Sequence, residues 1–420
     1  MVSCAGSRVP ESGGLRRLEQ TVPAITIVTV LLAVCPWASS PFMGPKWVAM
    51  LAGALASLLV LIPRPAVLGP IVLAAAANLA VASGLLPGVS APWWTLTGPL
   101  LIVALSLQRP ALPSGAIATA AAIVSAVVAL QAAGLDPFAW LAPDAGGGRL
   151  RLYGTLGNPD FVASVLGVTL PLTTSTALDA PAPRRSFLVS GGLQLLALVL
   201  LRSFATTLSL GAAALVVLVR MPRSSPRRSL LSLGLATAVL VVSIPLAGRS
   251  LSTAMQGRGY LVSVAAPHVA DAPWLGHGPG AVVRSWPVWE LEFWRARCGQ
   301  DAACVAADPR ARFTGVQDHV HDDWLERALE SGVPGLAALL ALLGTVLAAA
   351  LRSRTPEGVA IAAAVASLSA RATVDFPLER PADLSLLALL AGAAARLSCI
   401  DSSTPPAAVR KTPLPEGGAR

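Results

Sequence analysis

The sequence is short of charge, of lysine and of aromatic side chains. Charged residues make up only 13% of its 420 positions, and aromatic residues make up 5%. An ordinary soluble domain carries about 25% charged residues, so this composition excludes an entirely water-soluble protein. Lysine occurs only at positions 46 and 411, and arginine supplies the other 29 of the 31 basic residues. No block of these arginines is interleaved with aromatic residues, and we therefore expect no nucleic-acid partner.

Several signatures of known sites are also missing. The sequence has no Cys-x-x-Cys and no His-x-x-x-His spacing, so we expect no metal site. It has no Gly-x-Ser-x-Gly motif, so we do not expect the nucleophilic serine of an α/β-hydrolase. The glycine-rich turn at 276–280 resembles a nucleotide loop only superficially, because Pro279 interrupts it and no strand precedes it. No cofactor is therefore predicted.

The sequence instead contains many long runs of apolar residues. Hydrophobic residues reach 54%, and the mean hydropathy is +0.67. A membrane span needs about 20 apolar residues, and runs of this kind predict an all-α polytopic membrane protein with about twelve spans. Arg202 and Ser203 interrupt one long stretch, which we divide in two. The predicted spans are 21–38, 46–62, 65–86, 91–107, 112–133, 158–178, 186–201, 205–219, 229–247, 332–351, 356–374 and 382–399.

The arginines in the short loops predict the orientation, because positively charged loops stay on the inner side of a membrane. Most of them fall on one side when both chain ends are placed inside. We expect N-terminal spans at 1–133, central spans with an outer Arg-Gly-Asn-Pro motif at 134–247, and an outer catalytic loop at 248–325. C-terminal spans at 326–399 and an inner tail at 400–420 complete the chain.

The outer loop concentrates the reactive side chains. All four histidines lie in it, as do most of the tryptophans that are not at predicted span ends; the histidines are His268, His277, His319 and His321. Ten of the 22 acidic residues fall between 271 and 330. Histidines also avoid lipid for reasons unrelated to function, and this explanation is weaker for the pair at 319 and 321. A loop longer than about 15 residues is usually functional or disordered, so we expect function here.

Two cysteines in this loop, Cys298 and Cys304, are separated by five residues. An oxidising compartment outside the membrane would allow a local disulfide between them. The alternative is a pair of free thiols.

The segment from His321 to Gly335 predicts a short amphipathic helix. Asp323 and Glu326 have the spacing of a capping box, and Gly332 with Pro334 ends the helix before the next span. Capping and side-chain pairing within the helix are enough to explain these carboxylates, so the carboxylates alone do not indicate a functional site. It does not explain His321, which precedes the helix at the membrane surface.

A second group of residues surrounds Asn158. Asn158 suits a helix N-cap and Pro159 the first helical position, so both have a structural explanation. Arg149 and Arg151 are not needed for capping. They lie beside a span entrance, where an anionic lipid headgroup would be.

Four motifs, in order over roughly residues 145–400, resemble the O-antigen ligase and O-antigen polymerase superfamily of bacterial membrane glycosyltransferases. They are Arg151…Gly154-Thr155-Leu156-Gly157-Asn158-Pro159-Asp160, Arg258…Gly276-His277-Gly278, His321-Asp322-Asp323-Trp324-Leu325…Glu330-Ser331-Gly332, and Asp375-Phe376-Pro377. Two positions depart from the family pattern. Asp160 replaces a usual asparagine, and Leu210 stands where many members have arginine. Either Arg202 supplies the missing charge, or one contact to the donor is absent.

The resemblance implies a lipid-dependent glycosyltransferase fold of the GT-C type in the inner membrane of a bacterial cell envelope, with its active site facing the periplasm. It implies a polyprenyl-diphosphate-linked glycan as the donor. The acceptor would be a hydroxyl group of a lipopolysaccharide lipid A-core sugar, of a growing glycan or of a protein. Neither a nucleotide sugar nor a metal would be required.

On this interpretation Arg151 and Arg258 bind the diphosphate, with Arg149 and Arg202 as secondary candidates, because the arginine fork matches phosphate oxygens. His321 is the candidate general base, with Asp322 or Asp323 orienting its ring. The alternative is that His321 only binds phosphate. The predicted function is that of a ligase, and a polymerase of the same superfamily is the alternative within this enzyme class. A polysaccharide transporter without covalent chemistry is the alternative from another class, and the clustering of reactive residues in the outer loop favours an enzyme over it.

Overall fold

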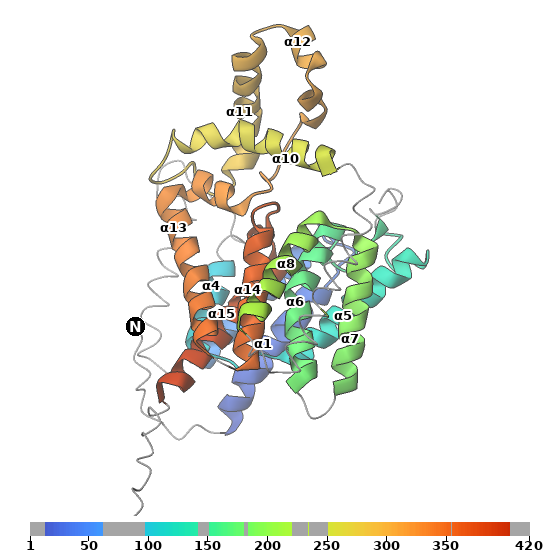
Figure 1. Ribbon diagram of the computed structural model, residues 1–420, viewed down its shortest axis with the longest axis vertical. Helices are drawn as coiled ribbons and strands as arrows, with labels where there is room; N and C mark the ends of the chain where they lie inside the picture. Colours follow the sequence, from blue (N-terminus) through green and yellow to red (C-terminus); the bar gives the residue numbers. More distant parts are fainter. Residues whose placement is uncertain are drawn as a thin grey trace, which may run out of the picture.

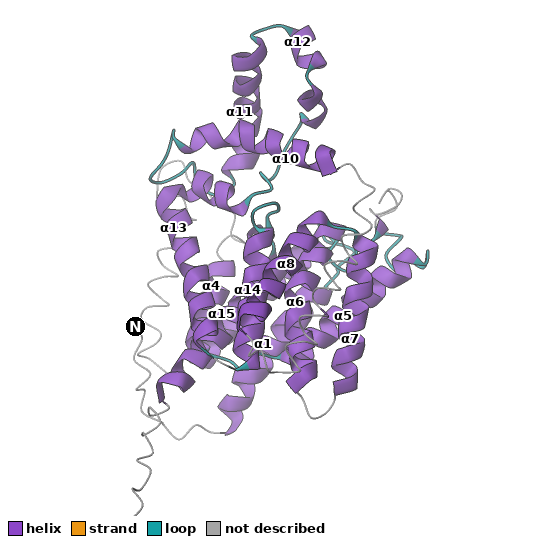
Figure 2. Cartoon of the chain, in the orientation of Figure 1, coloured by secondary structure: helices purple, strands orange, loops and turns teal. Residues whose placement is uncertain are grey.

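The computed structural model describes residues 13–61, 97–141, 151–179, 184–220, 234, 251–353 and 355–403. These residues form 13 α-helices and no strand (Figures 1 and 2). Figure 1 shows most of the helices gathered in one bundle and a smaller helical part standing on one end of it. We call that end of the bundle the polar end.

The bundle is built from apolar helices. Four of them, α2, α5, α13 and α15, are long and apolar enough to cross a membrane, and α4, α7 and α8 are shorter apolar helices. The architecture is that of a multi-pass, all-α membrane protein. The bundle helices are α1 (Gly13–Leu32), α2 (Gly44–Leu61), α4 (Thr97–Gln108), α5 (Ser114–Ala132), α6 (Pro159–Asp179), α7 (Arg184–Leu201), α8 (Phe204–Arg220), α13 (Asp323–Arg352), α14 (Pro356–Arg371) and α15 (Pro381–Ser403).

Most predicted spans coincide with these helices, and the differences have local causes. Span 65–86, and span 229–247 apart from residue 234, lie outside the described residues. The first span was predicted at 21–38, but α1 ends at Leu32. Pro36 has no N–H to donate to the carbonyl oxygen of Leu32, and its ring disfavours helical backbone at the residue before it. The stretch 186–219 divides as predicted. Arg202 and Ser203 form the turn between α7 and α8, and Arg202 has left-handed backbone with φ 50°.

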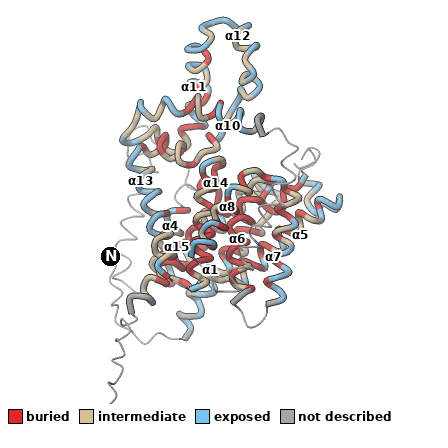
Figure 3. The backbone as a smooth tube through the Cα atoms, in the orientation of Figure 1, coloured by how far each residue is buried: buried red, intermediate tan, exposed pale blue. Residues whose placement is uncertain are grey.

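The bundle core is made of small and aliphatic side chains. Helix α14 is buried along most of its length, as the red tube in Figure 3 shows. Its alanines allow close approach to α6 and α8, in the way that small residues pack membrane helices. The Ser367 hydroxyl donates to the Gly167 carbonyl oxygen at 3.0 Å, which joins α14 to α6. The core therefore gains stability from close backbone packing rather than from large aromatic side chains.

The predicted outer loop is a folded helical unit, and we call residues 251–320 the polar domain. It contains α10 (Leu251–Ala265), η4 (Ala266–Val269), α11 (Ala281–Cys298), α12 (Ala302–Ala307) and η5 (Pro309–Phe313). Its core is aromatic, in contrast to the bundle, with Tyr260, Trp286 and Trp294 buried together. The Tyr260 hydroxyl donates to the Glu290 carboxylate, and burial raises the pKa of this phenol.

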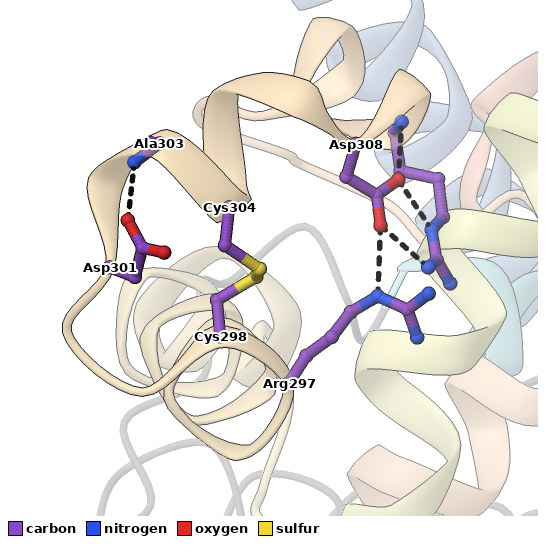
Figure 4. The surroundings of a disulfide bond; sticks show 7 residues. Arg297, Cys298, Asp301, Ala303, Cys304 and Asp308 are labelled. Atoms are coloured by element: carbon purple, nitrogen blue, oxygen red, sulfur yellow. Dashed lines mark hydrogen bonds and ion pairs between the residues drawn. A yellow bond between two sulfur atoms is a disulfide. The ribbon is translucent and has the colours of Figure 1, made fainter.

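The far tip of the polar domain is cross-linked. Cys298 and Cys304 form a disulfide that joins the end of α11 to α12 (Figure 4). The Asp301 carboxylate accepts from the Ala303 backbone at 2.8 Å and caps α12. The Asp308 carboxylate accepts from Arg297 Nε at 2.8 Å, which ties the returning chain to α11. The tip is therefore held by a covalent bond and by an ion pair.

Candidate functional site

Helix α13 begins one residue earlier than the capping pattern predicted. The Asp322 carboxylate accepts from the backbone nitrogens of Trp324 and Leu325, both at 3.0 Å, so Asp322 is the N-cap. The Asp323 side chain is 3% exposed, and its Oδ2 accepts from the Leu378 nitrogen at 2.9 Å. The Asp323 nitrogen donates to the Ala372 carbonyl oxygen at 2.9 Å. Asp323 therefore holds both ends of the segment 372–378.

The predicted end of the short helix is a kink inside α13. Gly332 has non-helical backbone, with φ 69° and ψ −177°, so the short helix ends there as predicted and a second helix, which ends at Arg352, follows it within α13. A Cβ atom at Gly332 would lie 2.6 Å from the Trp274 carbonyl carbon, so a side chain does not fit there. The Gly278 nitrogen donates to the Glu330 carbonyl oxygen at 3.0 Å, and the Gly280 nitrogen donates to the Glu330 carboxylate. The glycine turn and the Glu330–Gly332 motif thus form one interlocked structure.

His321 lies at the polar end, just before this helix. Its backbone is left-handed, with φ 59°, which is uncommon for a residue other than glycine. Its side chain is 39% exposed, and Nδ1 lies 3.8 Å from Asp375 Oδ1. The ring meets Phe376 edge-on, with the centroids 4.9 Å apart. Partial burial, together with the positive charges of Arg258 and His319, lowers the pKa of His321 below its ordinary value, and Asp375 opposes that shift.

Asp375 is the centre of a buried ionic network between α14 and α15. Its Oδ2 accepts from Arg371 Nε at 2.8 Å and from Arg380 Nη1 at 3.2 Å. Burial alone would raise the pKa of Asp375, but the two guanidinium groups hold it well below its usual range. Arg380 also pairs with Asp383 at 2.9 Å, and the Ser164 hydroxyl donates to Asp383 at 2.6 Å. The carboxylate that faces His321 is therefore fixed in place and ionised.

This geometry reassigns one predicted role. Asp322 and Asp323 were predicted to orient the His321 imidazole, but Asp322 caps α13 and Asp323 binds the Leu378 nitrogen. Asp375 contacts the imidazole instead. Sequence adjacency misled here, because Asp375 is distant from His321 in the chain and only the fold brings the two side chains together.

His319 has a different environment from His321. Its Nδ1 lies 2.7 Å from Glu326 Oε1, and its ring stacks on Phe376 with the centroids 4.0 Å apart. Burial acts to lower the pKa of His319, but the hydrogen bond and charge of Glu326 raise it above its ordinary value. The two imidazoles therefore contact Phe376 in different ways, and His319 is paired to a carboxylate.

The predicted arginines occupy different places. Arg258, on α10, is half-buried, and its Nε donates to the Val374 carbonyl oxygen at 2.7 Å, next to Asp375. Arg202 is exposed in the turn between α7 and α8. The next residue, Ser203, donates to the Asp160 carboxylate at 2.7 Å. Arg151 is exposed ahead of the Asn158 motif, and Arg149 lies outside the described residues. Arg258 is thus brought close to Asp375, and the diphosphate roles of Arg258 and Arg151 both stay predictions.

The Asn158 motif supports the start of α6. The Asn158 side-chain oxygen accepts from the Asp160 nitrogen at 2.8 Å, and Pro159 is the first helical residue. The Gly154 nitrogen donates to the Gln131 side chain at 2.8 Å, which fixes the motif to the end of α5. Arg371 Nη2 donates to the Asp160 carbonyl oxygen at 2.8 Å. The motif therefore positions one end of the ionic network.

Sequence reasoning placed Asp375 in a family motif but gave it no role in the site, and it did not assign Arg371 or Arg380 to the site. A signal was present, because Arg371 and Asp375 have i,i+4 spacing at the end of an apolar run, and Arg380 and Asp383 follow at i,i+3. Charges spaced this way beside apolar helices are usually paired. Among the described residues, no group of three or more His, Cys, Asp or Glu side chains is arranged to hold a metal ion.

Residues 189–340 match a family model described as O-antigen ligase. The match begins within α7 and ends within α13, so it contains Arg258, the glycine turn and His321. The resemblance stated from the motifs is confirmed by this match. The segments around Arg151 and Asp375 lie outside the matched residues. A comparison with curated proteins finds no match.

Proposed function

We propose that this chain, which carries an O-antigen ligase domain over residues 189–340, transfers a glycan from a polyprenyl-diphosphate carrier to an acceptor hydroxyl. The observation that carries the proposal is the position of His321. Its half-exposed imidazole lies 3.8 Å from the buried Asp375 carboxylate, and Arg258 binds the carbonyl oxygen of the neighbouring Val374, at the end of a bundle of apolar helices. A base beside a cation is what transfer from an anionic leaving group to a hydroxyl requires.

In the proposed reaction, the acceptor oxygen attacks the anomeric carbon of the donor glycan. The bond between that carbon and the diphosphate oxygen breaks, and the diphosphate leaves with both electrons. His321 takes the acceptor proton on Nε2, because Nδ1 faces the Asp375 carboxylate. A neutral imidazole is needed for this step, and the lowered pKa of His321 favours it at neutral pH.

The leaving diphosphate gains negative charge as the bond breaks, and preorganised cations stabilise that charge. Arg258 is the first candidate, because it stands on α10 directly over the Val374–Asp375 backbone. Arg202 is the second, because its turn is tied to Asp160 at the start of α6. Arg371 and Arg380 are bound to carboxylates and serve to position Asp375.

The proposal places the polar domain in the periplasm, with both chain ends in the cytoplasm. The arginine distribution in the short loops supports this orientation. Alkaline phosphatase fused after residue 290 should be active, and the same enzyme fused at the C-terminus should be inactive. An inactive fusion in the polar domain would refute the orientation.

The transfer reaction is tested with the purified chain in lipid nanodiscs. The donor is a polyprenyl-diphosphate-linked glycan, and the acceptors are a lipid A-core, a second donor molecule and a peptide. A product that requires the lipid A-core identifies a ligase, and lengthening of the carrier-bound glycan identifies a polymerase. Movement of donor across sealed vesicles without any covalent product would identify a transporter and overturn the proposal.

A further inference from the structure

The turn at 273–277 is fixed against the point where α13 enters its apolar run. The Val333 nitrogen donates to the Pro273 carbonyl oxygen at 2.8 Å, and the His277 nitrogen donates to the Leu329 carbonyl oxygen at 2.7 Å. Between these bonds, Gly276 and Gly332 approach the opposing backbones too closely for a side chain at either position. The two residues in the middle of the turn, Trp274 and Leu275, therefore have a fixed position along the axis of α13.

Both of these residues are large, apolar and exposed. Trp274 is 73% exposed and Leu275 is 84% exposed. Their neighbour Val333 is 49% exposed, and Leu340, further along α13, is 51% exposed. Only 22% of the apolar window of α13 is buried inside the protein, so most of that helix faces outward. Trp274 and Leu275 thus continue the apolar outer surface of a membrane-spanning helix.

The exposure of Trp274 is unusual within its own domain. Trp286, Trp289 and Trp294 of the polar domain are each less than a tenth exposed. Among the described tryptophans, the other strongly exposed ones are Trp37 at 91% and Trp140 at 65%. They follow the polar ends of α1 and α5, where those helices leave the apolar layer. Tryptophan is enriched at that level of a membrane, because one part of its ring is apolar and its N–H bonds to water or headgroups.

We propose that Trp274 and Leu275 insert into the headgroup region of the bilayer leaflet at the polar end and anchor the polar domain there. The inference rests on α13 spanning the membrane and does not depend on the transfer reaction. The anchored turn bonds to Leu329 and Glu330, on the short helix that follows His321. The anchor therefore fixes the depth of the short helix, and of His321 before it, relative to the headgroup region.

The test is a depth measurement on the full chain in nanodiscs of phosphatidylethanolamine and phosphatidylglycerol. Leu275→Cys is made after Cys4, Cys35 and Cys399 are replaced by alanine, and it is labelled with an environment-sensitive fluorophore. The nanodiscs are prepared with nitroxide lipids that carry the quencher either near the headgroup or deep in the acyl chain. Leu340→Cys is the membrane-embedded reference. Val288→Cys is the matched control, because it is 55% exposed on α11 of the same domain.

We expect nitroxide lipids to quench the label at 275 several-fold more than the label at 288, with headgroup quenchers more effective than deep ones. Equal quenching at 275 and 288 would overturn the proposal. Blue-shifted emission at 275 without nitroxide quenching would also overturn it, because that result indicates a protein contact. Lack of quenching at 340 would remove its premise. No donor or acceptor is present, so failure of glycan transfer leaves these outcomes unchanged.

Discussion

The two walls of the candidate site differ in how their charges are held. The wall from the bundle contains Arg371, Asp375 and Arg380, each 3% exposed or less, and joined by ion pairs of 2.8 to 3.2 Å. The wall from the polar side contains Arg258 and His321, which are half-exposed. His321 meets Asp375 only at 3.8 Å, which is longer than a hydrogen bond.

This difference indicates that the bundle wall positions the site, whereas the polar wall contains the residues that react. A buried ionic network is costly to break, because the remaining charge has no water to replace its partner. A half-exposed imidazole costs little to replace in stability, yet it can take up a proton from a bound acceptor. Substitutions in the bundle wall should therefore reduce the amount of folded protein, and substitutions in the polar wall should reduce turnover.

The largest effect on turnover is expected for His321→Ala. As a general base, His321 should contribute about 10²–10⁴-fold to transfer, while the variant remains inserted in the membrane at normal abundance. His321→Gln should be equally inactive, since an amide does not accept a proton at neutral pH. Initial rates of product formation, normalised to folded protein, measure both. Near-normal transfer by His321→Gln would remove the base role and leave His321 as a binding residue.

Substitutions in the bundle wall should lower the stability of the protein. Asp375→Asn leaves Arg371 and Arg380 facing a neutral amide, and loss of a buried ionic partner costs about 3–5 kcal/mol. We expect a clear fall in the melting temperature of the detergent-solubilised chain and in its yield. The matched control is Asp318→Asn, an exposed position in the polar domain. A stable Asp375→Asn protein that had lost only activity would show that Asp375 acts in the reaction, together with Arg258 and His321 of the polar wall.

Substitution of Arg258 tests whether this residue stabilises the negative charge of the leaving diphosphate. Loss of a hydrogen bond to a charged group costs about 1.5–3 kcal/mol, so Arg258→Ala should lower kcat/KM by about ten- to a hundredfold. Arg258→Lys keeps the charge but not the fork, and should remain defective. Arg295→Lys on the exposed face of α11 serves as the control. Full activity of Arg258→Ala at normal expression would contradict the assignment.

The smallest effect is a shift in pH dependence. Partial burial and the Arg258 charge lower the pKa of His321, so the base stays neutral below its ordinary pKa of about 6.5. Activity should fall only when the pH drops through that lowered value. Arg258→Gln removes a positive charge, so the pKa of His321 should rise and the acid limb should move to higher pH. Profiles of kcat/KM against pH for the two proteins measure the shift, and an unmoved limb would separate Arg258 from the base.

The apolar runs were sufficient to predict the helical membrane architecture, because period and length determine a span almost without tertiary context. The turn at Arg202 and the interruption at Gly332 were also visible as breaks in apolar stretches. The helical fold of the polar domain was not. Its core depends on contacts between Tyr260, Trp286 and Trp294, which are far apart in the chain and have no common motif.

Within the site, the sequence indicated His321 and Arg258 but not the partner of the imidazole. Asp322 and Asp323 are adjacent to His321 in sequence, and Asp375 is adjacent to it only in space. The arrangement follows from two bonds of Asp323, to Ala372 and Leu378, which no local pattern encodes. Long-range backbone contacts of this kind were the part of the site that could not be predicted.

The two glutamates one turn apart on the short helix have a consequence for how the polar domain is attached. The Glu330 carboxylate accepts from the Gly280 nitrogen, where the chain departs into α11, and the Glu326 carboxylate accepts from the Val320 nitrogen at 3.1 Å, where it returns. The excursion between them thus leaves and rejoins the protein at a single helical turn. The two ends of residues 281–319 are therefore fixed to the same turn of α13, and this attachment is next to His321 in the chain.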